Sequence, residues 1–359
     1  MQKANFYLTT IIAHKYAKFN TLLDKKLKKI YNYCKVNFID FKGDFMGFLY
    51  FLESIRCGFL DFLFLIVTAL GEEIAFLAVA VIIFWCVSKT EGYYILSVGF
   101  VGTTINQFLK LIFRIPRPWV LDSNFSPVDG AIEEATGYSF PSGHTQSSVG
   151  TFGGIAFFTK KKWLRITCIV LCVLVPFSRM YLGVHTPLDV GVSVLIALLL
   201  IFGLRPVFKL AEKKEYVMYI FLGFMTLLSL SYLLFVELYK FPSDIDAHNY
   251  ESGLKNAYTL FGALIGMLIS YPIEKRFVRF DVKGKWYTQV FKCVIGLIIV
   301  VLLKELLKLP LESLLPANTV ARAIRYALIV IFAVVIYPLT FKLFKRLEDK
   351  IESKRVQNK

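Results

Sequence analysis

The amino-acid sequence predicts an all-α polytopic membrane protein, with a six-helix transmembrane core followed by about four further transmembrane helices. Hydrophobic residues make up 56% of the 359 positions and charged residues only 19%, and the mean hydropathy is +0.59. A soluble protein of this length would carry more charge on its surface. Three stretches, 74–87, 195–204 and 294–303, contain no charged residue, which is typical of membrane spans.

The chain divides into three predicted parts. Residues 1–44 alternate apolar and lysine positions. This pattern fits an amphipathic helix on an anionic membrane surface or, equally well, a solvated helix on the protein's own loops. Residues 45–206 form the six-span core. Residues 207–359 carry about four more spans and a basic cytoplasmic tail, and packing, a lipid groove and contact within a homodimer are all open roles for them.

Ten spans are expected, near residues 45–70, 73–88, 92–113, 142–158, 163–180, 187–204, 215–238, 254–273, 287–307 and 321–344. The first is interrupted by Glu53, Arg56 and Gly58. Residues 45–70 therefore also fit an interfacial helix followed by a short span. That alternative would reverse the topology.

Lysine and arginine are concentrated in alternate loops. The basic loops lie within 160–165, 205–214, 275–285 and 342–350, whereas the opposite loops mix fewer cations with acidic residues. Because basic loops stay in the cytoplasm, we expect a multi-pass cell-membrane protein with both termini cytoplasmic. The formal charge of +16 then reflects these loops and their contact with anionic lipid, and no nucleic-acid partner is expected.

Small residues in the predicted spans are interpreted as packing positions. Gly262, Gly266 and Ser270 recur every fourth residue, which permits close approach of a second helix. The cysteines lie in or beside apolar runs without Cys-x-x-Cys spacing, so we predict neither a disulfide framework nor a metal site. They are Cys34, Cys57, Cys86, Cys168, Cys172 and Cys293.

Three polar clusters lie at the ends of predicted spans, all on the non-cytoplasmic face. In the first, Lys110, Arg114 and Arg117 are spaced by four and three residues, so they share a helical face until Pro116 and Pro118 end the helix. Such cations either bind an anion or extend to lipid headgroups.

The second and third clusters offer further anion-binding groups. Ser142 and Gly143 open the fourth span, where a hydroxyl and free backbone amides meet the positive end of the helix dipole. The same pair also fits an ordinary helix cap. Arg179 ends the fifth span on the same face.

Two of the four histidines, His144 and His185, lie in these clusters. Asp189 follows His185 by four residues, so its carboxylate can accept the Nδ1 proton and leave Nε2 as a nucleophile. His144 can then protonate a leaving oxygen. The developing charge on a phosphoryl group would be stabilised by the anion-binding groups, which are Lys110, Arg117, Ser142, Gly143 and Arg179. No acidic or histidine cluster shows metal-ligand spacing, so we expect neither a metal nor another cofactor.

Together the clusters resemble the three signature motifs of the type 2 phosphatidic acid phosphatase superfamily. The matching residues are Lys110 and Arg117-Pro118, then Pro141-Ser142-Gly143-His144, then Ser178-Arg179 with His185 and Asp189. The resemblance covers residues 45–206. It implies a metal-independent lipid phosphatase in which His185 forms a phosphohistidine and His144 is the general acid. Arg114 is not a motif position.

We therefore expect an enzyme that hydrolyses lipid phosphate or lipid pyrophosphate esters at the extracytoplasmic face. The first expected substrate is undecaprenyl pyrophosphate, followed by phosphatidylglycerophosphate, phosphatidate and sphingoid phosphates. Two alternatives stay open, a lipid phosphotransferase that uses the same phosphohistidine and a non-catalytic lipid-binding or transport protein. The loop at 119–139 is either a lid over the site or a plain connector.

Overall fold

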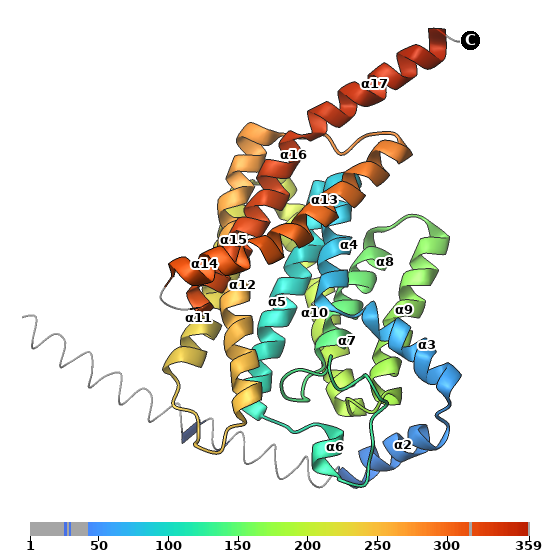
Figure 1. The fold of residues 1–359 in the computed structure, drawn as a ribbon, viewed down its shortest axis with the longest axis vertical. Helices are drawn as coiled ribbons and strands as arrows, with labels where there is room; N and C mark the ends of the chain where they lie inside the picture. The colour runs from blue at the N-terminus through green and yellow to red at the C-terminus, as the bar shows by residue number, and fades with distance from the viewer. Residues whose placement is uncertain (1–24, 27–28, 30–41, 316–317, 358–359) are drawn as a thin grey trace, which may run out of the picture.

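The computed structural model describes residues 25, 26, 29, 42–315 and 318–357, and every regular element in them is helical (Figure 1). The all-α prediction is therefore confirmed. Most of the expected amphipathic segment at 1–44 lies outside the described residues.

The N-terminal half contains α2 (Lys42–Ser54), α3 (Gly58–Ala69), α4 (Glu73–Cys86), α5 (Lys89–Phe113), α6 (Pro118–Leu121), α7 (Gly143–Ser148), α8 (Gly154–Phe158), α9 (Lys162–Tyr181) and α10 (Pro187–Lys213). The C-terminal half contains α11 (Tyr216–Leu238), α12 (Ala247–Ile273), α13 (Trp286–Leu306), α14 (Lys308–Leu314), α15 (Asn318–Ile331), α16 (Tyr337–Leu339) and α17 (Phe341–Gln357). Short π-helical turns continue three of the helices, namely η1 (Val149–Gly153), η2 (Glu274–Val278) and η3 (Phe332–Ile336).

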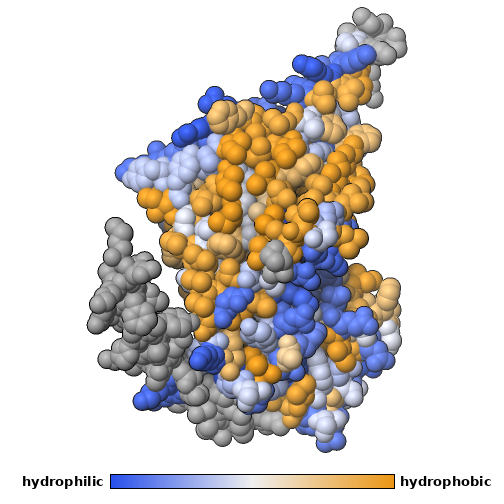
Figure 2. All heavy atoms as spheres, turned by 60° about the vertical axis from the view of Figure 1, so that its left-hand side comes forward, coloured by the Kyte–Doolittle hydropathy of each residue, from blue (hydrophilic) through white to orange (hydrophobic). Residues whose placement is uncertain are grey.

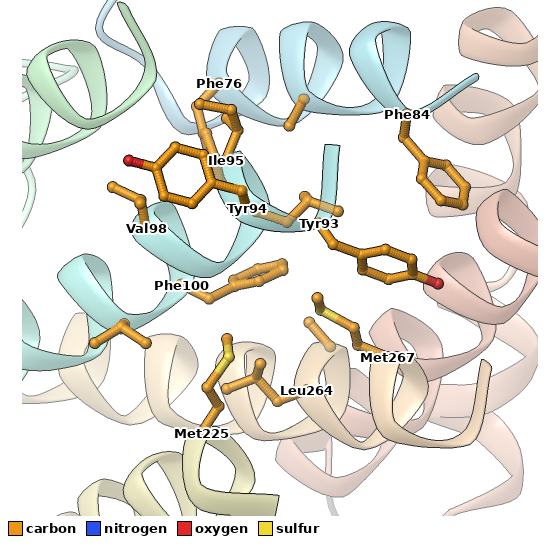
Figure 3. Close-up of a cluster of buried hydrophobic side chains, with 14 of the residues drawn as sticks. Phe76, Phe84, Tyr93, Tyr94, Ile95, Val98, Phe100, Met225, Leu264 and Met267 are labelled. Carbon is orange, nitrogen blue, oxygen red and sulfur yellow. The ribbon is translucent and has the colours of Figure 1, made fainter. Parts of the chain in front are cut away.

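Helix α5 is the centre of the packing, because more than half of its residues are buried. The close-up in Figure 3 shows Phe76 and Phe84 of α4 on one side of it, and Met225 of α11 with Met267 of α12 on the other. The ring of Phe100, on α5, packs edge-on against Phe76 with centroids 6.1 Å apart. Since Lys110 is in the last turn of this helix, the aromatic packing fixes the position of the first polar cluster.

Six helical segments in the described residues are long and apolar enough to cross a membrane, and the bent pair α3–α4 makes a seventh candidate. The six are Lys89–Leu121, Lys162–Tyr181, Pro187–Lys213, Tyr216–Leu238, Ala247–Val278 and Asn318–Ile351. On the face in Figure 2, hydrophobic side chains cover the middle of the molecule and hydrophilic ones concentrate toward its two ends. The chain is thus a multi-pass membrane protein, and its described residues contain fewer full-length spans than the ten expected.

The expected fourth span is one of the short ones. The helix that begins with α7 and continues through η1 and α8 runs only from Gly143 to Phe158. At 1.5 Å per residue it is about 24 Å long, less than the roughly 30 Å of a hydrocarbon core.

The largest departure from expectation concerns residues 45–88, where two spans were predicted. The helices α3 and α4 meet at an angle of 49°. Each is only about 18–21 Å long, so neither crosses a bilayer alone, but together they can. Gly71 permits the bend beside the second cluster, since a Cβ there would lie 2.9 Å from the carbonyl oxygen of His144.

Helix α2 is not part of a span and lies on the loops that follow α5 and α9. The backbone N–H of Ser126 donates to Glu53 Oε1 at 3.2 Å, and Arg56 Nε donates to the carbonyl oxygen of Tyr181 at 3.0 Å. The arrangement matches the alternative of an interfacial helix before a span. Helices α2 and α17 consequently lie at opposite ends of the bundle (Figure 1). The location of the N-terminus itself depends on residues outside the described ranges.

Close packing of α12 with α15 confirms the interpretation of the small residues. A Cβ on Gly262 would lie 2.0 Å from the carbonyl oxygen of Ala323, and one on Gly266 would lie 2.6 Å from that of Ala327. Only glycine allows the two backbones to approach this closely. These contacts hold the C-terminal helices together as one packed unit.

The C-terminal helices also pack on the core through α4. Trp85 Nε1 donates to the carbonyl oxygen of Ala333 at 2.8 Å. The thiols of Cys86 and Cys293 lie 3.3 Å apart, although 207 residues separate them in the sequence. The sequence predicted only packing roles for both cysteines, since nothing in their spacing brings them together.

We predict that a mild thiol oxidant will link Cys86 to Cys293, because a sulfur–sulfur bond of about 2.05 Å needs only a small movement of either side chain. The two thiols lose two protons and two electrons to the oxidant. Mass spectrometry of the digested protein should show the linked peptides, and Cys293→Ser should abolish them. Cys168 and Cys172, which share α9, serve as the internal control and should stay unlinked. Persistent free thiols at 86 and 293 would contradict the packing of α4 on α13.

Candidate active site

The three polar clusters converge on one cavity of about 310 Å³. Its lining includes five of the predicted site residues, which are Lys110, Arg117, Gly143, His144 and His185. Ser142, Arg179 and Asp189 lie behind this lining and are fully buried. The structure therefore brings all eight predicted residues to one place.

His185 lies in the turn between α9 and α10, with one ring nitrogen on each side of the site. Arg117 Nη1 is 2.8 Å from its Nε2. Because arginine only donates hydrogen bonds, Nε2 must accept and the ring proton must be on Nδ1. Nδ1 faces Asp189 Oδ2 at 3.4 Å. This tautomer places a lone pair on the nitrogen that faces the cations.

Burial and the neighbouring cations lower the pKa of His185 well below its ordinary value of 6.5. Burial is the larger cause, since it disfavours the charged imidazolium. The positive charges of Arg117, Arg179 and Lys110 act in the same direction. The imidazole is consequently neutral at pH 7.

The chain folds locally in a way that fixes both His185 and Asp189. Thr186 caps α10 and Pro187 follows it at the first helical position. The Asp189 carboxylate accepts from the backbone N–H of Thr186 at 2.8 Å, and the Thr186 hydroxyl accepts in return from the N–H of Asp189 at 3.3 Å. This reciprocal capping box orients the helix start. Gly183 supplies the left-handed turn before it, with φ +78°.

Ser139 is a site residue that the sequence did not indicate. Its hydroxyl donates to Asp189 Oδ2 at 2.6 Å and lies 3.5 Å from His185 Nδ1. The carboxylate is therefore held by Ser139 and by the capping box as well as by the histidine. No spacing rule connects residue 139 to residue 189, so only the fold could reveal this contact.

Lys110 and Arg117 are fixed by the end of the loop at 119–139. Lys110 Nζ donates to the carbonyl oxygen of Tyr138. Arg117 donates through Nη2 to the carbonyl oxygen of Thr136 at 2.8 Å and through Nη1 to that of Val184 at 2.9 Å. Both cations are thus oriented by neutral carbonyl acceptors. Arg114, which is not a motif position, ends α5 in a left-handed conformation with φ 48°.

Ser142 serves as the N-cap of α7. Its Oγ accepts from the backbone N–H of Thr145 at 3.4 Å, and Asn106 Nδ2 donates to its carbonyl oxygen at 3.3 Å. The capping role and the anion-binding role are compatible, because a hydroxyl that accepts can still donate its own proton. The cap places Gly143 and His144 at the cavity wall. In the described part of the chain, His144 Nε2 is buried without a hydrogen-bond partner.

Arg179 is the least satisfied cation of the site. Its side chain is fully buried, and Nη1 donates to Thr68 Oγ1 at 2.7 Å. Nε and Nη2 have no hydrogen-bond partner among the described residues. Two buried guanidinium donors without acceptors are costly for an empty site and are suited to a bound anion.

Further polar residues line the cavity beyond the motifs. Asn106 Oδ1 and both side-chain polar atoms of Gln146 are buried and unpartnered within the described ranges. Three lining residues come from the C-terminal helices, which the sequence had left without a role at the site. They are Asn256, Lys304 and Tyr326. The site is therefore formed by both halves of the chain.

The loop at 119–139 covers one side of the site. Val128 donates its backbone N–H to the carbonyl oxygen of Leu182 at 3.0 Å, and Val128 and Ala131 pack with Tyr181 in a small buried cluster. Glu134 and the neighbouring Thr136 line the cavity. The loop is a packed wall of the site in this state.

Within the described residues, no group of three or more histidine, cysteine, aspartate or glutamate side chains is arranged to hold a metal ion. The cations gathered at the site are the lysine and the two arginines, and the N-terminus of α7 lies beside them.

Comparison with known proteins gives several partial matches. A probable sphingosine-1-phosphate phosphatase of Dictyostelium discoideum is 31% identical over 160 residues, which is 41% of this chain and 38% of that protein. Undecaprenyl-diphosphatase BcrC of Bacillus subtilis is 29% identical over 134 residues, which is 36% of this chain and 66% of that protein. Phosphatidylglycerophosphatase B of Bacillus subtilis is 32% identical over 149 residues, which is 38% of this chain and 69% of that protein. The chain thus spans only part of each relative.

Family comparison covers both halves of the chain, whereas no solved structure matches it. Residues 258–350, which include α13 and α15, match the family described as the transmembrane extension of PAP2 superfamily phosphatases. Residues 91–213, which contain all eight predicted site residues, match the PAP2 superfamily itself. With its motifs gathered at one cavity, a match to the superfamily over the site and a match to the transmembrane extension over the C-terminal half, the chain belongs to the PAP2 superfamily.

Proposed function

We propose that the protein is an integral membrane phosphatase that hydrolyses lipid phosphate or lipid pyrophosphate esters through a phosphohistidine on His185. One observation carries the proposal. His185 has its protonated nitrogen toward Asp189 and its lone-pair nitrogen 2.8 Å from Arg117. That is the orientation required for attack on a phosphorus atom that the arginine holds.

The reaction has two displacement steps. In the first, Nε2 of His185 attacks phosphorus, a nitrogen–phosphorus bond forms, and the bond to the leaving oxygen breaks. His144, which must be in its protonated form for this step, donates a proton to that oxygen, and the oxygen departs as the lipid alcohol or lipid phosphate. In the second, His144 accepts a proton from water, the water oxygen bonds to phosphorus, and the nitrogen–phosphorus bond breaks. Inorganic phosphate leaves and His185 regains its lone pair.

The three cations and the start of α7 stabilise the charge that gathers on the equatorial oxygens. Arg117 exchanges its contact with Nε2 for a phosphate oxygen when the substrate enters. Arg179 gains acceptors for Nε and Nη2, which have none among the described residues. Lys110 adds a further charge from the end of α5.

We further propose that the site faces the extracytoplasmic side. The basic loops at 160–165, 205–214 and 275–285 lie at the end of the bundle opposite the site (Figure 1), and basic loops stay in the cytoplasm. The C-terminal tail is then cytoplasmic, and residue 42 is on the outer side. A lipid substrate enters sideways with its tail in the bilayer.

The relatives support a lipid substrate but differ in their named substrates. Their names refer to sphingosine 1-phosphate and undecaprenyl diphosphate, and to phosphatidylglycerophosphate. For this chain we place undecaprenyl pyrophosphate first, then phosphatidylglycerophosphate, phosphatidate and sphingoid phosphates. An extracytoplasmic site is suited to recycling a carrier lipid.

A lipid phosphotransferase is the second candidate, and one observation favours it. Asn106 and Gln146 line the cavity with buried amide atoms that have no partner in the described chain. Such groups could hold the hydroxyl of an acceptor in place of water. Products measured with and without an added alcohol separate the two reactions, because transfer yields a new phosphate ester and less inorganic phosphate.

The proposal is tested by phosphate release from a panel of lipid phosphates by detergent-purified protein, with EDTA present. We expect release to continue in EDTA and the preferred lipid to identify the substrate class. The absence of release from every lipid, in protein shown to be folded, would contradict a phosphatase. Loss of release in EDTA, restored by a divalent cation, would contradict the metal-independent mechanism.

The lowered pKa of His185 predicts the pH dependence. The neutral form of His185 is the nucleophile. The fraction of active enzyme therefore falls only when the pH drops through the pKa of His185 in the folded protein. Since this pKa is well below 6.5, the acidic limb of kcat/KM that reports on His185 should lie below pH 6.5. A pH profile of kcat/KM with a soluble short-chain lipid phosphate measures it. An acidic limb of kcat/KM centred above pH 6.5, with no further limb at lower pH, would contradict the prediction.

A further inference from the structure

A second cavity lies in the C-terminal half, at the end of the bundle opposite the active site. It has a volume of about 400 Å³. Its walls come from the segment between η2 and α13, from the first turns of α13, and from α16 with α17. Figure 1 places these elements at the upper end, far from α6 and the start of α7.

The lining of this cavity is strongly basic. It contains six cationic side chains and two carboxylates, so its formal charge is +4. The cations are Arg279, Lys283, Lys292, Lys342, Lys345 and Arg346, and the carboxylates are Asp281 and Glu348. Both carboxylates already accept hydrogen bonds from the backbone. Asp281 accepts from the N–H of Lys283 at 2.9 Å and Glu348 from that of Lys285 at 2.9 Å.

Lys292 is the residue that points to a ligand. Only 3% of it is exposed, and its Nζ lies 4.6 Å from the ring centroid of Phe341. No carboxylate of the described chain lies within ion-pairing distance of it. A buried ammonium without an anionic partner is costly. The surface lysines of a basic loop do not share this feature, because water solvates them.

The remaining lining is apolar, and this selects the class of anion. Phe280, Pro338 and Phe344 share the cavity with the cations. Immediately outside it, Leu343 and Leu347 of α17 are more than half exposed. A site with cations at its centre and apolar walls matches an amphiphile whose phosphate is buried and whose acyl chains stay in the bilayer.

We infer that this cavity binds the phosphate group of an anionic phospholipid from the leaflet at that end of the protein. Lys292 is the central contact, and Arg279, Lys345 and Arg346 surround the phosphate. The inference does not depend on the proposed phosphatase reaction. It gives the C-terminal half a role of its own besides contributing to the active-site wall.

The test measures thermal unfolding of the full-length protein in detergent with three additions, namely phosphatidylglycerol, phosphatidylcholine and inorganic phosphate. Phosphatidylglycerol is a suitable probe because it is a phosphodiester and not a phosphatase substrate of the proposed kind. We expect it alone to raise the Tm of the wild-type protein. Lys292→Met should weaken its apparent affinity at least tenfold.

Two further variants keep the test decisive. Lys345→Gln combined with Arg346→Gln removes two exposed cations of the cavity, so folding is preserved, and it should also weaken binding. Lys161→Gln removes an exposed cation outside the cavity and should bind as the wild type does. Equal shifts with phosphatidylcholine, a full shift with inorganic phosphate alone, or unchanged binding in the cavity variants would each overturn the inference.

Discussion

Replacement of His185 by alanine is expected to abolish phosphate release, with kcat lowered by about 10⁴-fold or more. The side chain supplies the atom that attacks phosphorus. Among the described residues that line the cavity, no other histidine has a carboxylate facing its Nδ1 atom. The measurement is steady-state release of inorganic phosphate from the preferred lipid. Protein amount and Tm are recorded in parallel, because the side chain is buried and its loss leaves a small cavity.

His248→Ala is the matched control for this prediction. His248 is exposed in the first turn of α12 and does not line the cavity. The variant should retain wild-type activity. His185→Asn, which is closer to the original volume, should be as inactive as the alanine variant while unfolding near the wild-type temperature. Activity in folded His185→Asn within tenfold of the wild type would exclude His185 as the nucleophile.

Arg179→Met is expected to lower kcat/KM by about 10²–10³-fold without destabilising the protein. The loss of activity follows because two guanidinium donors without partners in the described residues are those available to the phosphoryl oxygens. Stability should be preserved because the change removes a buried charge that repels Arg117 and Lys110. The Tm of the variant should equal or exceed that of the wild type. Stabilisation by added vanadate should be lost.

Arg205→Met provides the contrast. Arg205 Nη1 forms an ion pair with Glu91 Oε2 at 2.6 Å, at the other end of the bundle. Loss of this ion pair should lower the free energy of unfolding by about 1 kcal/mol and leave kcat/KM unchanged. The two variants should therefore show opposite patterns in Tm and activity. A large fall in the Tm of Arg179→Met, together with unchanged kcat/KM, would show that Arg179 is a structural residue.

The sequence predicted the composition of the site because short-range spacing determines it. Lys110, Ser142 and Arg179 each lie at the end of a helix. Helix ends that lie at the same membrane face place their terminal polar side chains near one another. His185 and Asp189 are separated by one helical turn, so their contact is also local.

Contacts between distant segments could not be predicted in this way. Ser139 reaches Asp189 across 50 residues, and Cys86 reaches Cys293 across 207. The bend between α3 and α4 was missed for a related reason. Hydropathy along 45–88 shows only that the segment is apolar, whereas the close packing of Gly71 at the bend against His144 is a contact between distant segments.

The C-terminal half shows the same division between local and long-range information. Its small-residue spacing predicted a close helix contact, and α12 packs on α15 through Gly262 and Gly266. No spacing pattern connects Lys304 or Tyr326 with the three polar clusters, although both line the active-site cavity. Both residues lie in largely apolar helices, and only the packing of α13 and α15 against the core brings them to the cavity.

Phosphate is proposed to pass through a covalent bond to His185, and this claim can be tested by trapping the phosphohistidine intermediate. The protein is mixed with a ³²P-labelled lipid phosphate and quenched within the first turnover, under alkaline conditions that preserve a nitrogen–phosphorus bond. We predict label on the peptide that contains His185, sensitive to acid and absent from His185→Ala. Label on a serine or aspartate, or a fully active enzyme in which no labelled peptide forms during rapid quenching, would contradict the claim.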